Sequence, residues 1–229
     1  MNKTDVLKML ESQSSSIKST RTAAIGNTKT YGIGLTVLRK LAKTIGKDHK
    51  LALELWATDI YELRILGLLI DDPKMITREQ AASQLDEFDE PLYPHVFSAC
   101  GSPLSKVPFV VELATDWIDS KEKLRRECGY GLLSEIASSK KKNAPDDKFF
   151  LAYVDRIHQG FKKHGIVEGA YALLCIGKRN KDLNAAALKV AKEIGPIELD
   201  SDSGTCQPFD LVDHLTKDHL KQRLGIPND

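Results

Sequence analysis

The stretch at residues 55–70, LWATDIYELRILGLLI, decides how this chain folds. It is typical of the end of one helix, a short break at Thr58 and Asp59, and a second helix. In the second helix the apolar residues recur at intervals of three and four, which places them on one face. They are Ile60, Leu63, Leu66, Gly67 and Ile70. One helix pair cannot bury this much apolar surface alone, so we expect it to stack on similar pairs.

The chain supplies such pairs further along. In residues 109–137 a tryptophan again stands eight residues before an arginine that directly follows a leucine. The two matched pairs are Trp56 with Arg64 and Trp117 with Arg125. A weaker third copy covers about residues 149–177. This repetition predicts an array of helical pairs in which each pair covers its neighbour.

The rest of the chain also favours an all-α fold, because the alternating runs of Val, Ile, Thr and Tyr that indicate strands do not occur. We expect a single domain. It would have a lead-in at residues 1–30, a repeat core at 31–195 and a C-terminal loop and helix at 196–229. Asp48, Thr77 and either Asp146 or Asp147 are placed to cap helix N-termini.

Three further segments carry specific expectations. The helical pattern fails over residues 86–108, which contain four of the nine prolines, so this segment is interpreted as a long irregular connection. Such a loop could carry function or simply join two repeats. The last repeat is expected to pair helices at 165–176 and 184–194, and one continuous amphipathic helix is expected at 210–224.

Charge limits the function classes. The chain has 33 Lys and Arg against 32 Asp and Glu, a net charge of +1, so any nucleic-acid partner would require cations gathered on one face. A basic row on the helix that follows residue 34 could be such a face or merely a solvated outer surface. Its members are Arg39, Lys43, Lys47 and Lys50.

Cysteine and histidine usage indicates no metal site. The four cysteines lie tens of residues apart without a C-x-x-C pair, and we interpret them as reduced thiols packed among apolar neighbours. The six histidines have no metal-ligand spacing, and no glycine loop suited to phosphates is present, so no metal or cofactor is expected. No apolar run has the length of a signal peptide or a membrane span, which predicts a cytoplasmic protein without a membrane partner.

Several motifs occur in an order that resembles one family. Residues 31–43, YGIGLTVLRKLAK, are followed by Leu55-Trp56 and by residues 61–64, YELR. Further on come LDEFD at 85–89, Trp117-Ile118 and AKEIG at 191–195. The set is similar to the DNA alkylation repair family of HEAT-like repeat proteins, over residues 31–208 or so.

The resemblance implies an α-α superhelix of HEAT-like repeats that binds duplex DNA, damaged or intact, along a basic concave surface. Catalytic members of the family hydrolyse the N-glycosidic bond of N3- and N7-alkylated purines. Such a base is cationic and a good leaving group, so the enzyme mainly has to stabilise the oxocarbenium-like sugar and position a water molecule. A protein of this kind would be a DNA glycosylase without a cofactor.

The family's catalytic motif is a tryptophan followed four residues later by an aspartate. In ungapped register these positions hold Pro91 and His95, so the catalytic aspartate is not matched. Asp89 is the nearest carboxylate and is the candidate catalytic residue. The family's second aromatic residue corresponds to Tyr171, and its arginine to Arg126 or, in another register, to Glu127.

We expect DNA contacts from cations of the repeats together with this aromatic ring. The candidates are Arg39, Lys43, Arg64, Arg125, Arg126, Tyr171, Lys178 and Arg179. A second class of function stays open, in which the repeats form a non-catalytic scaffold that binds another protein or structured DNA. The near-neutral net charge favours that alternative.

Overall fold

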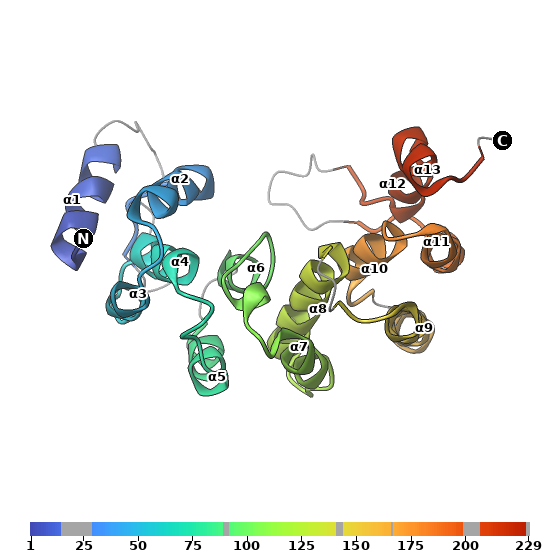
Figure 1. Cartoon of the computed structure of the whole chain (residues 1–229), viewed down its shortest axis with the longest axis horizontal. Coiled ribbons are helices and arrows are strands. Elements are labelled where there is room, and N and C mark those ends of the chain that lie inside the picture. Colours follow the sequence, from blue (N-terminus) through green and yellow to red (C-terminus); the bar gives the residue numbers. More distant parts are fainter. Residues whose placement is uncertain (15–28, 89–91, 141–143, 166, 199–206, 228–229) are drawn as a thin grey trace. The chain divides into compact units, whose positions relative to one another are not determined.

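The computed structural model describes residues 1–14, 29–88, 92–140, 144–165, 167–198 and 207–227. Its helices are α1 (Lys3–Ser14), α2 (Leu35–Ile45), α3 (His49–Trp56), α4 (Tyr61–Ile70), α5 (Arg78–Asp86), α6 (Leu92–Ser98), the 3₁₀ helix η1 (Leu104–Lys106), α7 (Val110–Ile118), α8 (Lys123–Ser138), α9 (Asp147–His164), α10 (Ala170–Gly177), α11 (Lys181–Ile194), α12 (Leu211–Thr216) and α13 (Asp218–Leu224) (Figure 1). The described ranges contain two isolated β-bridges and no strand, so the all-α prediction is confirmed. None of the described helices is both long and apolar enough to span a membrane.

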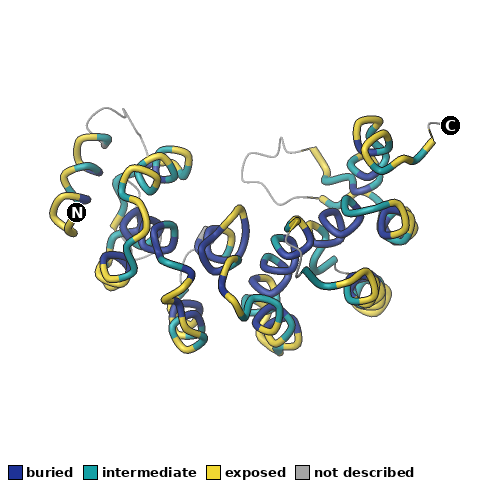
Figure 2. Tube along the Cα trace, in the orientation of Figure 1, coloured by how far each residue is buried: buried dark blue, intermediate teal, exposed yellow. Residues whose placement is uncertain are grey.

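The chain forms two compact units, Met1–Cys128 and Gly129–Asp229, and the boundary between them falls within α8. In each unit the buried residues lie on the sides of helices that face other helices of that unit (Figure 2). The three N-cap predictions are confirmed: Asp48 accepts a hydrogen bond from Leu51 N, Thr77 from Gln80 N, and Asp146 from Phe149 N. The single-domain organisation expected from the sequence stays a prediction.

The pair α3 and α4 forms the centre of the first unit, as the sequence predicts. The apolar residues on the facing sides of both helices are buried, among them Leu55, Leu63, Leu66 and Ile70. Burying a leucine contributes roughly 1.5–3 kcal/mol, so this face holds much of the unit together. The helices approach closely at Gly67, where a Cβ atom would lie 2.8 Å from the Ala52 carbonyl oxygen. Glycine is therefore required at this crossing.

The prediction of an irregular segment at 86–108 was wrong in part, because α6 and η1 lie within it. Pro94 is the third residue of α6, in the first turn, where a backbone N–H has no partner within the helix and its loss costs little. Tyr93 and Phe97 of this helix are buried, and the Phe97 and Trp117 rings stack with centroids 6.0 Å apart. Proline content therefore gave a misleading indication of a loop.

In the second unit, the helix expected at 165–176 begins later than predicted. Gly165 ends α9 with φ +67°, and Gly169 precedes α10 with φ +83°. Both values favour glycine and interrupt a helix. A Cβ atom at Gly169 would also lie 2.5 Å from Cδ1 of the Tyr130 ring. The next helix, α11, begins at Lys181 instead of residue 184, because the Asn180 side chain accepts from Leu183 N.

The single C-terminal helix predicted at 210–224 is two helices, α12 and α13. Lys217 separates them with an extended ψ of 134°. Leu215 and Leu220 are both buried, but at a spacing of five residues they would point in different directions on one continuous helix. The break at Lys217 allows both leucines to reach the core.

Candidate nucleic-acid interface

Arg64, the arginine of the first repeat, is held inside the first unit. Its guanidinium carbon lies 4.6 Å from the centroid of the Trp56 ring. Its Nε donates to the backbone oxygens of Trp56 and Thr58, at 3.2 and 3.1 Å. The side chain is only 16% exposed. Arg64 therefore closes the C-terminal end of α3, where backbone carbonyls lack helical partners.

Two adjacent carboxylates at the end of α5 receive the repeat arginines of this unit. Arg64 Nη2 lies 3.4 Å from Glu87 Oε2, which also accepts from Trp56 Nε1 at 3.0 Å. Arg125 donates to Asp86 and, at 3.2 Å, to Glu122 Oε2. The arginines of the two sequence repeats, Arg64 and Arg125, thus bind neighbouring acids, Glu87 and Asp86. The charges of both arginines are locally compensated.

The other cations predicted in the first unit differ in exposure. Arg126 donates to the backbone oxygens of Ser120 and Lys121, at 3.2 and 2.7 Å, and so fixes the turn between α7 and α8. Arg39 is half-buried on α2 and Lys43 is exposed on the same helix. The prediction of one basic row on a single helix was wrong in part, because α2 ends at Ile45 with Gly46 as its C-cap. Lys47 lies beyond α2 and Lys50 belongs to α3, so only Arg39 and Lys43 share α2.

The candidate catalytic residue Asp89 lies outside the described residues, as does Pro91. His95, at the position of the family's aspartate, is exposed on α6, and its Nε2 lies 3.1 Å from Cys100 Sγ. An imidazole side chain carries no negative charge with which to stabilise an oxocarbenium-like sugar. His95 therefore supplies no equivalent of the missing aspartate.

The cysteines only partly match the prediction of packed thiols. Cys128 and Cys175 are free and buried, and burial raises the pKa of the Cys128 thiol to about 12. Cys100 is free but exposed, with φ +55°, in the turn that follows α6, so the prediction was wrong there. Cys206 lies outside the described residues.

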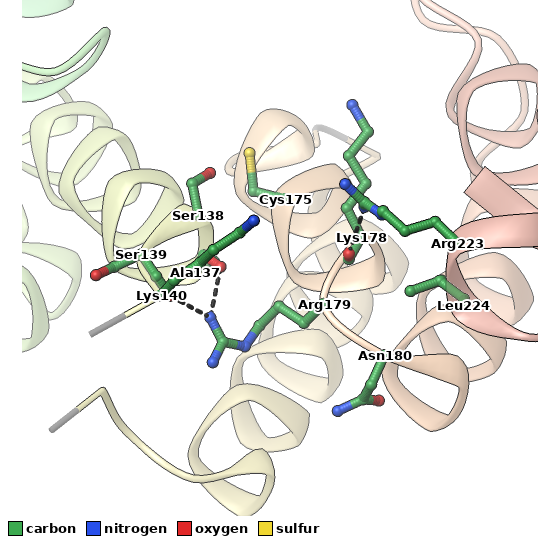
Figure 3. A pocket seen from close by; sticks show the side chains of 10 residues that line it. All are labelled: Ala137, Ser138, Ser139, Lys140, Cys175, Lys178, Arg179, Asn180, Arg223 and Leu224. Carbon is green, nitrogen blue, oxygen red and sulfur yellow. Dashed lines mark hydrogen bonds between the residues drawn. The ribbon is translucent and has the colours of Figure 1, made fainter. Parts of the chain in front are cut away.

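The second unit contains a cavity of about 430 Å³ that we term the basic pocket (Figure 3). Its lining residues are Ala137, Ser138, Ser139, Lys140, Cys175, Lys178, Arg179, Asn180, Arg223 and Leu224. Four of these carry a positive charge and none is an aspartate or glutamate. Two of the predicted DNA contacts, Lys178 and Arg179, are brought together here.

Helix ends build the basic pocket. Arg179 donates from Nη1 to the backbone oxygens of Ala137 and Ser139, at 2.6 and 3.3 Å, where α8 ends. Its guanidinium carbon lies 4.3 Å from the centroid of the Phe150 ring. Arg223, at the end of α13, donates to the Lys178 backbone oxygen at 2.8 Å. Both arginines thus satisfy carbonyls at helix C-termini.

The charge of the basic pocket is only partly offset. The C-termini of α8, α10 and α13 contribute about half a negative charge each, which is less than the four cations supply. Within the described residues, the Lys140 and Lys178 side chains make no hydrogen bond or ion pair. Burial raises the pKa of the Cys175 thiol, so this group is neutral at pH 7 and adds no negative charge. Two acids lie next to lining residues: Asp147 accepts from Asn180 Nδ2 at 2.9 Å, and the charge of Glu135 acts on the Cys175 thiol. The four cations of the lining still outnumber these acids, so the basic pocket has an excess of positive charge.

Sequence reasoning missed Lys140 and Arg223 as members of the site. Lys140 belongs to a lysine run that looks like an exposed linker, and Arg223 lies at the end of an amphipathic helix. They are identified as site residues only because they line the same pocket as Lys178. Tyr171, the predicted aromatic contact, is 56% exposed in the first turn of α10 and does not line the basic pocket.

Stacked helical pairs define a helical-repeat protein, and its second unit carries a cluster of cations. The profile of the family described as DNA alkylation repair enzyme matches residues 6–192, and the chain belongs to this family. The resemblance seen in the sequence is thereby confirmed.

Known relatives cover most of the chain. It is 25% identical over 189 residues to Uncharacterized protein Lin0241 of Listeria innocua serovar 6a, which covers 82% of each protein. The identity to Uncharacterized protein Lmo0209 of Listeria monocytogenes serovar 1/2a is also 25%, with the same coverage.

A solved structure has the same fold at 20% identity and a TM-score of 0.77, covering 99% of this chain and 97% of the other. It represents a new family of proteins related to the HEAT-like repeat DNA glycosylases with affinity for branched DNA structures. This likeness confirms the prediction of HEAT-like repeats.

Proposed function

We propose that this protein binds DNA through its phosphates and that the basic pocket of the second unit is a main contact site. The observation that carries the proposal is the gathering of four cations with no acid among the lining residues, in a chain of net charge +1: Lys140, Lys178, Arg179 and Arg223. Neutralising phosphates releases counterions from DNA, which favours binding to such a cluster. Membership of the DNA alkylation repair family supports a DNA ligand.

We propose that the protein binds branched DNA as well as duplex DNA. The protein with the same fold has affinity for branched DNA structures. A junction presents strands in several directions and therefore offers phosphates to a compact site that a straight duplex would contact only at its edge. Arg64 and Arg125 are expected to contribute less, because Glu87 and Asp86 compensate their charges.

The test is the dependence of affinity on salt, measured by fluorescence anisotropy on a duplex and on a three-way junction of the same length. We expect affinity to fall steeply with salt. Lys178→Gln should reduce the slope of log affinity against log salt by about 1. Arg125→Gln removes the same charge from a paired arginine and should leave the slope unchanged. A flat salt response, or no binding, would contradict the proposal and favour a protein-binding scaffold.

Excision of N3- or N7-alkylated purines is a finer form of this proposal and depends on Asp89. The neighbouring Asp86 and Glu87 accept hydrogen bonds from Arg125, Arg64 and Trp56, so they are engaged elsewhere. The experiment is the release of 7-methylguanine from methylated DNA. Release by the wild-type protein that is lost in Asp89→Asn would support excision, and no release would leave DNA binding alone.

A further inference from the structure

The basic pocket has the dimensions of a small-molecule site. Its volume of about 430 Å³ lies within the roughly 300–1,000 Å³ that is usual for such sites. Its walls come from the end of α8, the turn between α10 and α11, and the end of α13. A duplex contacts such a cavity through phosphates that pass its opening, whereas the phosphate at the end of a strand can enter it.

Two of its cations are placed to share a ligand. Figure 3 shows Lys140 and Arg223 reaching toward the pocket from opposite sides, beside Cys175. Arg223 uses one Nη2 donor for the Lys178 backbone oxygen, and a guanidinium has five N–H donors in total. Lys140 has three N–H donors and no hydrogen bond among the described residues. The pocket thus retains several charged donors for an incoming anion.

The positive charge of the basic pocket favours a phosphomonoester over a phosphodiester. A phosphodiester within a DNA strand carries one negative charge, whereas a phosphomonoester carries about 1.5 to 2 near pH 7. A terminal phosphate also has three oxygens free to accept hydrogen bonds. Two charged groups on opposite sides of the cavity match the monoester better than the diester. Charge-assisted hydrogen bonds of this type are about twice as strong as neutral ones.

We infer that the basic pocket binds a phosphomonoester between Lys140 and Arg223, and that this group is the terminal phosphate of a DNA strand. The inference rests on the proposed DNA binding and assigns a specific ligand to the same site. A strand end is what a nick, a gap or a flap exposes, so the pocket would direct the protein to interrupted DNA. The alternative source of the same chemistry is a free nucleotide.

The experiment compares a flap junction that carries a 5′-phosphate, or a 3′-phosphate, with the same junction ending in hydroxyl groups. Binding of the wild-type protein should be about tenfold tighter with one of the two phosphates. Lys140→Gln and Arg223→Gln should each remove this gain. Lys189→Gln is the matched control, because Lys189 is exposed on α11 outside the pocket lining, and it should retain the gain.

The outcomes distinguish a failure of terminal-phosphate recognition from a failure of DNA binding. Equal affinity for all junction ends would overturn the phosphate assignment while DNA binding stands. No binding to any junction would overturn both. Deoxyadenosine monophosphate serves as the competitor. If it displaces DNA only at millimolar concentration, the ligand is a strand end. If it displaces DNA at micromolar concentration, the assignment to a strand end is overturned in favour of a free nucleotide. Thermal melting of each variant establishes that it is folded.

Discussion

Arg64 in the first unit and Arg179 in the second occupy closely similar local sites. Each guanidinium lies over an aromatic ring, at 4.6 Å from the Trp56 centroid and 4.3 Å from the Phe150 centroid. Each donates to two backbone oxygens at the C-terminal end of a helix. The difference is the acid: Glu87 lies beside Arg64, while no carboxylate lines the pocket of Arg179.

The same arrangement of an arginine, an aromatic ring and a helix end thus has its charge compensated by a carboxylate in one unit and not in the other. Backbone carbonyls satisfy the hydrogen-bonding geometry of a guanidinium but carry only partial charge, so they do not neutralise it. A carboxylate does neutralise it. The first unit therefore uses its arginine within the fold, and the second unit leaves positive charge at its surface. Three experiments test the two halves of this contrast.

The largest effect is expected from Arg64→Met. The substitution removes the contact with Trp56 and leaves the carbonyls of Trp56 and Thr58 without their donor. Charged hydrogen bonds and a partly buried cation–π contact together predict a loss of about 3 kcal/mol in the free energy of unfolding. Urea denaturation measures it. Arg78→Met breaks a more exposed pair with Asp116 and a more exposed contact with the Phe109 ring, 5.1 Å from its centroid, without uncapping a helix end, and should cost about 1 kcal/mol.

If Arg64→Met lowers the free energy of unfolding no more than Arg78→Met does, the enclosed arginine adds little to the stability of the fold, and the contrast with Arg179 fails. DNA affinity of the folded variant should stay within about twofold of the wild type, since the charge of Arg64 is already compensated by Glu87.

A second experiment places an acid in the lining of the basic pocket, to which Arg179 also belongs. Ser138→Asp adds a negative charge to the lining of the basic pocket. We expect DNA affinity to fall about tenfold at low salt, because the added carboxylate offsets one cation. Ser138→Asn, which has nearly the same size and no charge, is the control in the same anisotropy assay. Equal affinities for the two variants would exclude the pocket from DNA binding.

The smallest effect is expected from Glu87→Gln, which makes the site of Arg64 resemble that of Arg179. Glu87 is 46% exposed, so the free energy of unfolding should fall by less than about 1 kcal/mol. DNA affinity should change by no more than about twofold, because Arg64 stays enclosed by Trp56 and the carbonyls. A fivefold gain would instead support the sequence prediction that Arg64 contacts DNA.

Much of the architecture could be predicted from the sequence, for reasons visible in particular residues. The apolar spacing from Leu63 to Ile70 is helical, and a residue on a buried helix face has to be apolar. Capping also depends on local chemistry, so Asp48 and Thr77 mark helix starts. Pro94 and Lys217 misled the interpretation, because a proline in a first turn is tolerated and a lysine gives no indication of a break.

The candidate site was less predictable. Lys178 and Arg179 could be proposed as DNA contacts because they are adjacent cations between two expected helices. Lys140 and Arg223 could not, since they lie about 40 residues to either side and belong to segments that look solvated. Equally, no sequence pattern indicated that Glu87 and Asp86 would compensate the arginines of both repeats.

The sequence by itself therefore determined the helical repeats, their caps and the family, since each depends on local spacing and on which residues can be buried. Only the tertiary structure decided which cations are neutralised. That outcome depends on distances between side chains from separate helices, and charge interactions change steeply over a few ångströms. An arginine beside Glu87 and an arginine beside backbone carbonyls look alike in the sequence, but only the first has its charge compensated by a carboxylate that the structure places there.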